Sequence, residues 1–546
     1  MKNLYKINTL LILIFSFLYS DFDSNVSYEL KYAKDESDST EYFENIYDIS
    51  FFFDDYYFFS QLEYKDPALL GPKTDSFSSA VNFFYLQHSK EKYDITIGNL
   101  FLMQGRGLSI HTYEDRNIDY DNSLLGIETI YHLKNNVDII SIFGKKNIKS
   151  RLIPDETIPT ISVKNTLGSL GVYASFDYFS IHYQGMSYKQ EYSKETLNQL
   201  RRMDGVLGDY LKERFSSSGN EFQDYEMQNL EHNLGVEFSL ANLDIYYEKS
   251  LVFYNKIMDE RITGYRDYLS FYFNLFNFNI IYEYKNYNTP YLYNVFCNGP
   301  TTFREPNSAL TSRNSHSVNF SNEYGHQLEI IRSFDKGMNF IFNYSFAYHH
   351  LENQSEPNLF ETFEYIYDTS ELVNQADFKP FRQLYIELSD WNYKDDFYYK
   401  IGYDHYYEIT KLGYGFVETK TYPMQFTYKF KGGNSFSTYL EFQNFYNQDN
   451  SNLDLISNYK YTYLSPSYNH YGKWILTFFS EQGRYQTSDY KFKTWSGLDF
   501  TYNIKNSNQL SLFLGSQVGG LVCANGTCVQ QPDFEDGFKI TYRTSF

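Results

Sequence analysis

Apolar and polar residues alternate along one stretch of the chain after another. From 421 to 430, Tyr, Met, Phe, Tyr and Phe occupy the even positions, and Thr, Pro, Gln, Thr and Lys occupy the odd ones. The same period of two recurs at 236–241, 269–275, 339–346 and 498–505. Because successive side chains of a β-strand point to opposite faces, each stretch predicts a strand of about ten residues with one apolar face.

The connections between these predicted strands alternate between short and long. This alternation is typical of a membrane barrel, which has short turns at one rim and long loops at the other. We therefore predict an all-β fold: a large antiparallel transmembrane β-barrel of about 24 strands, an even number within roughly 20–26. Short turns are predicted at 134–136, 242, 276–277, 335–337, 431–434, 466–470 and 505–508, and long loops at 189–223, 287–315, 447–454, 484–490 and 519–535.

The last predicted strand ends on an aromatic residue. Phe538, Ile540, Tyr542 and Phe546 lie on one face of it, which suits lipid, while Lys, Thr, Arg and Ser fill the other face. This ending resembles the closing strand of bacterial outer-membrane barrels, whose terminal Phe is the signal read by their assembly machinery. We expect it to pair with a first strand at 24–33, so that the sheet has no edge and both termini face the periplasm.

Residues 1–20 predict a cleaved secretory signal peptide. Lys2 and Lys6 precede an apolar run from Leu10 to Leu18, and the small residue Ser20 stands at a plausible cleavage position. Beyond this run, no stretch approaches the ~20 consecutive apolar residues of a spanning helix. Residues 21–546 are therefore predicted to form a single barrel domain in the bacterial outer membrane.

Composition and charge restrict the partners. The 58 Tyr and 50 Phe residues favour strands and suit the aromatic girdles of a barrel in outer-membrane lipid. The formal net charge of −21 would repel a polyanion, which argues against nucleic acid. Acidic loops and an acidic lumen instead favour small solutes, with divalent cations or cationic solutes among them.

One segment departs from the strand pattern. Between 194 and 213, apolar residues recur at helical spacing, which predicts a short amphipathic helix within an outward loop. Gly205 and Gly208 weaken this prediction. Two roles remain open for the helix: it could pack the loop, or it could plug the lumen.

The candidate functional site lies between 97 and 122. Gly105 and Gly107 flank Arg106 and leave the backbone free to bend, so that the guanidinium could approach a group of carboxylates. Two interpretations stay open: an inward-folded lumen constriction that filters ions or holds a ligand, or a loop braced by ion pairs. The carboxylates belong to Glu114, Asp115, Asp119 and Asp121.

A second local pattern predicts a disulfide. Asn525-Gly526 is the preferred pair for a two-residue type I′ turn, which makes Cys523 and Cys528 a facing, non-hydrogen-bonded pair. Their Cα atoms would lie within disulfide reach, and an exported location favours the bond. Cys297 is expected to be a thiol in a loop.

Catalytic and metal-binding patterns are not visible in the sequence. His349 and His350 alternate faces on a strand, and neither an HExxH motif nor a Cys/His ligand spacing occurs. We therefore predict no enzyme, no cofactor and no metal site.

Several motifs occur together along the chain. They are Gly-Arg-Gly-Leu at 105–108, Tyr-Glu-Asp-Arg at 113–116, Asp-Asn-Ser-Leu-Leu-Gly at 121–126, Asn-Gly-Pro-Thr-Thr-Phe-Arg-Glu-Pro at 298–306 and Gly-Gly-x-x-Cys-x-x-Gly-x-Cys at 519–528. With the signal peptide, they resemble an uncharacterised family of large bacterial outer-membrane barrels, a domain of unknown function. The resemblance implies no catalytic or binding residue. It implies only the activities of such barrels in general, which are passage of solutes or display of loops.

Three hypotheses for function follow. The first is a passive outer-membrane channel or transporter for small solutes, with a preference for cations. The second is a non-conducting barrel that serves as an interaction or assembly scaffold for a secretion or envelope complex. The third is a soluble secreted Tyr-rich β-protein.

Overall fold

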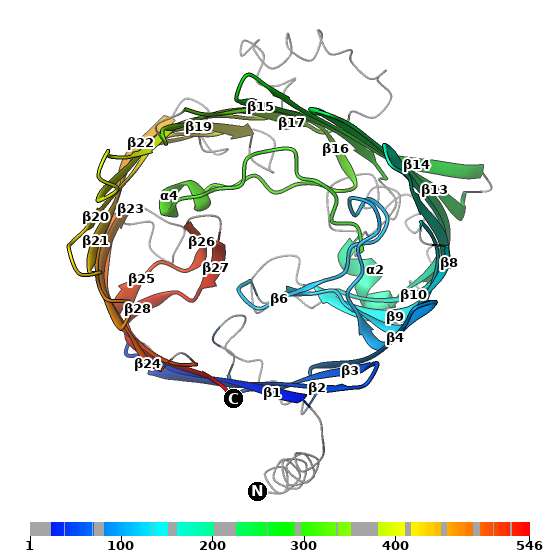
Figure 1. Ribbon diagram of the computed structural model, residues 1–546, viewed down its shortest axis with the longest axis horizontal. Coiled ribbons are helices and arrows are strands. Elements are labelled where there is room, and N and C mark those ends of the chain that lie inside the picture. Colours follow the sequence, from blue (N-terminus) through cyan, green and yellow to red (C-terminus); the bar gives the residue numbers. More distant parts are fainter. Residues whose placement is uncertain are drawn as a thin grey trace, which may run out of the picture.

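The protein is a closed barrel of 24 antiparallel strands, seen through its ring in Figure 1. Every strand pairs with the next in sequence, apart from two small hairpins, β6–β7 and β26–β27, that form sheets of their own. The all-β prediction and the count of about 24 are therefore confirmed. The computed structural model describes residues 23–37, 39–67, 69, 81–118, 120–134, 136–150, 161–200, 225–258, 260–289, 296–334, 337–350, 380–409, 416–448, 456–483, 492–505, 507–524 and 527–546.

The wall strands of the first half are β1 (Asp23–Asp35), β2 (Thr40–Phe53), β3 (Tyr56–Lys65), β4 (Phe83–Lys90), β5 (Tyr93–Leu100), β8 (Leu124–Lys134), β9 (Val137–Ser150), β10 (Ile161–Ser175), β11 (Phe179–Tyr192), β12 (Tyr225–Leu240), β13 (Leu243–Met258) and β14 (Glu260–Leu275). Those of the second half are β15 (Phe278–Asn288), β16 (Asn322–Ser333), β17 (Asn339–Tyr348), β18 (Phe381–Trp391), β19 (Phe397–Ile409), β20 (Phe416–Lys429), β21 (Ser435–Gln448), β22 (Ile456–His470), β23 (Trp474–Gly483), β24 (Lys493–Lys505), β25 (Asn508–Gln517) and β28 (Phe534–Ser545). The other elements within the described residues are β6 (Glu114–Asp115), β7 (Tyr120–Asp121), β26 (Gly520–Ala524), β27 (Thr527–Gln531) and the short helices α2 (Lys194–Leu200) and α4 (Ala309–Ser312).

The first and last strands close the ring. β1 pairs with β28 in antiparallel register, with Tyr32 opposite Ile540 and Leu30 opposite Tyr542. The backbones of Val26 and Phe546 exchange two hydrogen bonds at the rim, of 2.9 and 3.0 Å. Because the described strands form a closed sheet, neither β1 nor β28 presents an open edge to lipid. The predicted pairing of the two terminal strands is confirmed.

Each strand presents opposite chemistry to the two sides of the wall, and β12 shows this clearly. Leu230, Leu234 and Phe238 point outward and are 45, 45 and 39% exposed. Glu231 and Asn233, between them in the sequence, point inward and are each 1% exposed. The period-two pattern of the sequence thus separates a lipid-facing surface from a polar lumen.

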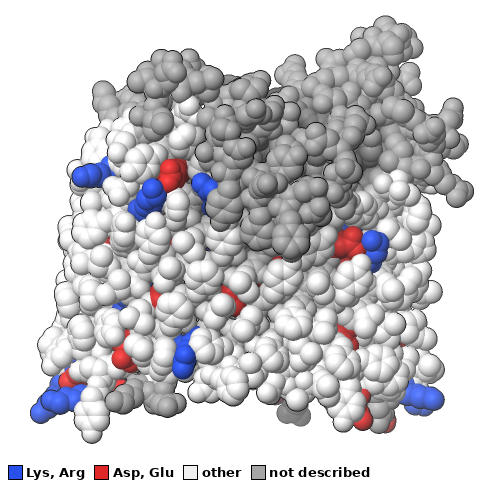
Figure 2. All heavy atoms as spheres, turned by 90° about the horizontal axis from the view of Figure 1, so that it is seen from above, with Lys and Arg blue, Asp and Glu red and all other residues white. Residues whose placement is uncertain are grey.

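The outside of the barrel carries few charged side chains, as Figure 2 shows for one side of the wall. Such a surface is unsuited to water, because large contiguous apolar areas on a soluble protein drive association. This surface argues against the hypothesis of a soluble secreted β-protein. No helix among the described residues is long and apolar enough to cross a membrane, a finding that does not bear on crossing by strands.

Two details of the connections differ from the sequence prediction. Residues 466–470, predicted as a turn, lie inside β22, and the turn follows at 471–473, where Tyr471 has a φ of 52°. Pro466 misled the prediction, although proline is tolerated within a strand where its missing N–H is not needed. The last strand also begins earlier than expected, at Phe534.

The helix predicted at 194–213 is present in part. α2 lies inside the ring (Figure 1), and Leu197 packs into an apolar cluster with Leu102 and Ile110. The hydroxyl of Thr196 donates to the backbone carbonyl of Ser162 at 3.0 Å, which ties α2 to β10. Residues 201–213 lie outside the described part of the chain.

Candidate functional site

Besides the β11–β12 connection that carries α2, the described residues show the β5–β8, β15–β16 and β25–β28 connections folding inward from the wall (Figure 1). They contain the motifs at 105–116, 298–306 and 519–528, which are far apart in sequence. The structure therefore places the described residues of these motifs inside the ring, with the β15–β16 connection in contact with each of the other two.

The β5–β8 connection turns inward at Gly105. This residue has a φ of +58°, and a Cβ added to it would lie 2.5 Å from the carboxylate of Glu248. The backbone N–H of Arg106 donates to Oε2 of Glu248 at 2.7 Å, and its guanidinium lies 4.9 Å from the centre of the Tyr246 ring. Glycine is thus required here both for the backbone angle and for the close approach.

The predicted acidic group occupies a different place from Arg106. Arg116 is the cation beside Glu114, at 3.6 Å, and it also bonds to Asp48 on β2. Asp121 pairs with Lys146 of β9 at 2.6 Å. The reason is the β6–β7 hairpin, which carries these acids away from the glycine turn and towards other strands. Asp115 accepts a hydrogen bond from the backbone N–H of Asn117, and Asp119 lies outside the described residues.

The β15–β16 connection, residues 296–321, crosses the inner wall and is called the strap below. Its first part meets the β5–β8 connection: the N–H of His111 donates to the carbonyl of Phe296 at 2.6 Å. The side-chain amide of Asn298 donates back to the carbonyl of His111 at 3.1 Å. The hydroxyl of Tyr287, on β15, donates to the carbonyl of Pro300 at 2.9 Å.

The far end of the strap is held by two wall carboxylates. Glu441 of β21 accepts hydrogen bonds from the Ser308 hydroxyl and from the N–H groups of Ala309 and Leu310, at 2.8, 2.8 and 2.9 Å. These N–H groups begin α4 and have no partner within the helix, so the carboxylate caps them. Arg313, just after α4, forms two hydrogen bonds with Glu481 of β23, of 3.1 and 3.0 Å.

The β26–β27 hairpin meets the strap from the other side. Arg313 donates to the carbonyl of Gly519 at 3.1 Å. The predicted register is confirmed, with Ala524 opposite Thr527 and Cys523 opposite Cys528. The disulfide between the two cysteines stays a prediction, and the turn residues 525 and 526 lie outside the described part of the chain. Cys297, in contrast, is buried at the start of the strap.

Two buried cations fasten these segments to the wall. Arg266, 0% exposed, pairs with Glu231 at 2.9 Å and also donates to the carbonyl of Leu108 in the β5–β8 connection. Lys285, also 0% exposed, pairs with Glu323 at 2.5 Å and donates to the carbonyl of Thr301 in the strap. Buried charges need a partner of opposite sign, so each cation fixes the position of one inward connection.

His316 lies at the end of the strap between two carboxylates. Its Nε2 is 3.2 Å from Glu323 and its Nδ1 is 2.9 Å from Glu408, and its ring stacks on Phe381 with centroids 4.1 Å apart. Burial opposes a charge on His316, but the hydrogen bonds to the two carboxylates outweigh it and raise the pKa of the imidazole above its usual value. Both ring nitrogens can donate only when the ring is protonated, so the geometry suits the imidazolium.

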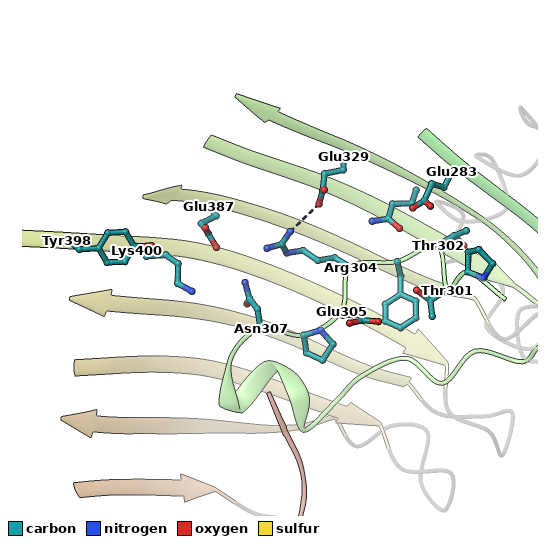
Figure 3. Close-up of a pocket in the computed structure, with 14 residues that line it drawn as sticks. Glu283, Thr301, Thr302, Arg304, Glu305, Asn307, Glu329, Glu387, Tyr398 and Lys400 are labelled. Carbon is teal, nitrogen blue, oxygen red and sulfur yellow. Dashed lines mark hydrogen bonds and ion pairs between the residues drawn. The ribbon is translucent and has the colours of Figure 1, made fainter. Parts of the chain in front are cut away.

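A hollow of about 570 Å³ lies between the strap and the inner faces of β15–β19 (Figure 3). It is polar: four carboxylates and two cations line it, together with Thr, Asn and Gln side chains. The volume falls within the range of ordinary ligand sites. Its charged residues are Glu283, Glu305, Glu329, Glu387, Arg304 and Lys400.

Arg304 belongs to the strap and contacts wall residues that line or adjoin the hollow. It pairs with Glu329 at 3.1 Å, and its guanidinium stacks over the Tyr385 ring at 4.2 Å. The Tyr385 hydroxyl in turn donates to Glu387 at 2.5 Å and accepts from the Asn307 amide at 3.0 Å. One stacked arginine thus joins the strap motif to β16 and β18.

Sequence reasoning missed the wall residues of the hollow. Glu283, Glu329, Glu387 and Lys400 each lie at an ordinary inward position of a strand. Strand parity could have assigned them to the lumen, but not to one site, because their proximity depends on the pairing of β15–β19 and on the path of the strap.

Comparison with solved structures finds large membrane barrels. The copper transporter OprC matches with a TM-score of 0.46 and 9% identity, over 97% of this chain and 81% of that one. The siderophore receptor PirA from Pseudomonas aeruginosa matches with a TM-score of 0.45 and 8% identity, over 96 and 80%. The P pilus usher PapC translocation pore matches with a TM-score of 0.40 and 9% identity, over 96 and 99%.

Sequence comparison gives a more specific result. No curated protein matches the chain in sequence. One family model matches residues 1–546, which is the whole chain and includes all three inward motifs. The chain therefore belongs to the family of unknown function DUF6029.

Proposed function

We propose that the protein is a passive channel of the bacterial outer membrane for small solutes, with a preference for cations. The observation that carries the proposal is the charge of the hollow beside the strap, which is lined by four carboxylates and two cations. The formal net charge of −21 has the same sign. A charged lining of this kind concentrates counter-ions in a pore and repels ions of its own sign.

The inward connections give this channel its constriction. Arg106, predicted to face acids of its own loop, instead bonds to Glu248 of the wall through its backbone N–H, with its guanidinium over the Tyr246 ring, and the strap adds Arg304 and its partner Glu329. The pore is therefore narrowed by segments that are fixed to the wall, not by a separate domain. Divalent cations and small cationic or zwitterionic solutes are the cargo that this lining favours.

The proposal also includes the export of the chain across the inner membrane and its assembly in the outer membrane. Residues 1–20 would direct the chain across the inner membrane as a cleaved signal peptide. Phe546, 73% exposed at the end of β28, would be the residue read by the barrel-assembly machinery, together with Phe538, Ile540 and Tyr542 of the same strand. The rim that carries the start of β1 and the end of β28 would then face the periplasm.

Conductance in a planar bilayer tests the function. The refolded barrel should give steady ohmic steps, and in a salt gradient its reversal potential should have the sign of cation selectivity. An anion-selective reversal potential would overturn the cation preference, and a silent membrane with correctly folded protein would overturn the channel.

A second function, a non-conducting scaffold that presents loops to an envelope or secretion complex, has one observation in its favour. Buried pairs such as Arg266–Glu231 and Lys285–Glu323 hold the inward segments firmly to the wall. A lumen filled by fixed segments would conduct little. The silent bilayer described above is the result that supports this alternative.

A further inference from the structure

The carboxylates of the hollow differ in how they are neutralised. Glu329 forms an ion pair with Arg304. Glu387, 6% exposed, accepts its hydrogen bond from the neutral hydroxyl of Tyr385, and Glu283 accepts one from the hydroxyl of Tyr268. Within the part of the chain that the structure describes, neither Glu283 nor Glu387 has a cation at ion-pair distance. Each of these two carboxylates is thus held by a neutral tyrosine hydroxyl and not by a direct ion pair, although Arg106 and Lys285 act on Glu283 from a greater distance.

Lys400 is a cation of the same hollow, and it too lies apart from charges of the opposite sign. It follows Tyr398 on the inward face of β19, and Ser389, its partner on β18, lies two residues beyond Glu387. Among the described residues, no carboxylate lies within ion-pair distance of its ammonium. Figure 3 shows Lys400 and Glu387 extending from neighbouring strands into the space beneath the strap. The hollow therefore offers a cation and carboxylates that do not neutralise each other.

Thr302 adds an unsatisfied polar group to the same hollow. It is 2% exposed and belongs to the lining, and its hydroxyl has no hydrogen-bond partner among the described residues. A buried hydroxyl without a partner costs free energy. A ligand that donates to it or accepts from it would remove this cost.

We propose that the hollow is a binding site for a zwitterionic solute of di- or tripeptide size. The solute's ammonium lies against Glu283 and Glu387, its carboxylate lies against Lys400, and its amide groups meet the Thr302 hydroxyl. Charge-assisted hydrogen bonds at both ends set the orientation, and the volume of about 570 Å³ accommodates such a molecule. The inference rests on the proposed channel for the entry route of the solute, and it names the class of solute.

Isothermal titration of the full, detergent-purified barrel with trialanine tests the site. Two blocked forms dissect it: N-acetyl-trialanine lacks the ammonium, and trialanine amide lacks the carboxylate. Each should bind roughly tenfold more weakly than trialanine, because each loses one charge-assisted contact. Equal affinity of the three peptides would overturn the zwitterion site.

Substitutions test which residues bind the carboxylate and the ammonium of the solute. Lys400→Met should weaken trialanine roughly tenfold and leave trialanine amide unchanged, while Lys400→Arg should retain affinity. Glu387→Gln should weaken trialanine and its amide and leave the acetylated peptide unchanged. Matched controls are Lys31→Met on β1 and Glu237→Gln on β12, which change inward residues away from the hollow and should leave trialanine binding unaltered.

The result is separable from the channel proposal, because titration in detergent needs no conduction. Trialanine binding with the expected variant pattern, together with a silent bilayer, would overturn the channel and support the site. A conducting barrel without trialanine binding, or one in which Lys400→Met changes nothing although the protein is folded, would overturn the site and leave the channel.

Discussion

The two faces of β12 lie a few ångströms apart and follow opposite rules. On the outer face, Leu230, Leu234 and Phe238 have no polar partner to find and are 45, 45 and 39% exposed. On the inner face, Glu231 is buried and is satisfied by Arg266 at 2.9 Å and by the Ser250 hydroxyl. A side chain that is stable on one face would be costly on the other.

The comparison shows that the side chains of the two faces depend on residues at different separations in the sequence. The outer face needs only apolar residues at every second position, and lipid accepts any arrangement of them. The inner face needs particular partners: Arg266 also bonds to Leu108, which is 158 residues away in sequence. Local pattern therefore specifies the wall, and long-range pairing specifies the lumen.

The largest expected effect comes from breaking the inner pairing. Arg266→Met removes the cation and leaves Glu231 buried without its partner, which should lower the free energy of unfolding by about 3–5 kcal/mol. Urea unfolding in detergent measures it. The double variant Arg266→Met, Glu231→Gln should recover much of the loss, and a single variant as stable as the parent would contradict the account of the inner face.

A somewhat smaller effect is expected on the outer face of the same strand. Leu234→Arg places a charge near the middle of β12 where the wall faces lipid, at a cost of about 2–4 kcal/mol. Urea unfolding in lipid vesicles, with Leu234→Met as the control, should show this loss of stability. An arginine tolerated as well as the methionine would mean that this face does not contact lipid.

The smallest effect is a pH dependence of the strap. The pKa of His316 is raised in the folded protein by Glu323 and Glu408, so its contribution to stability is complete below the ordinary histidine pKa and is lost as pH rises through the folded value. Unfolding followed at pH 6 and at progressively higher pH should show this loss. His316→Gln should abolish this loss of stability at higher pH. If the variant and the parent have the same pH dependence of unfolding, His316 does not contribute to it.

The wall was largely predictable from sequence. The period of two at 421–430 or 498–505 and the aromatic ending at Phe546 depend only on neighbouring residues, and they indicated a closed ring of about 24 strands. Pro466 shows where this reasoning fails, because a proline signals a turn in sequence even when it lies inside a strand such as β22.

The lumen was only partly predictable. The glycines around Arg106 signalled a turn, but its partner Glu248 is 142 residues away, and Arg313 meets Glu481 across 168 residues. Such pairs cannot be chosen from sequence, since many inward glutamates are equivalent until the strands are in register. The same holds for Lys400 and Glu387, whose neighbourhood is created by the β18–β19 pairing.

Single-channel conductance of a strap variant tests the central claim, that fixed inward segments narrow a cation-preferring pore. The double variant Arg313→Met, Glu481→Gln removes one of the two attachments at the far end of the strap without leaving an unpaired charge, and the Glu441 contacts remain. Its matched control, Lys249→Met, Asp267→Asn, removes an ion pair of 3.0 Å between β13 and β14. The account predicts larger conductance steps for the strap variant and parental steps for the control, both with cation selectivity. Steps of parental size in the strap variant, or silence in all three proteins, would contradict it.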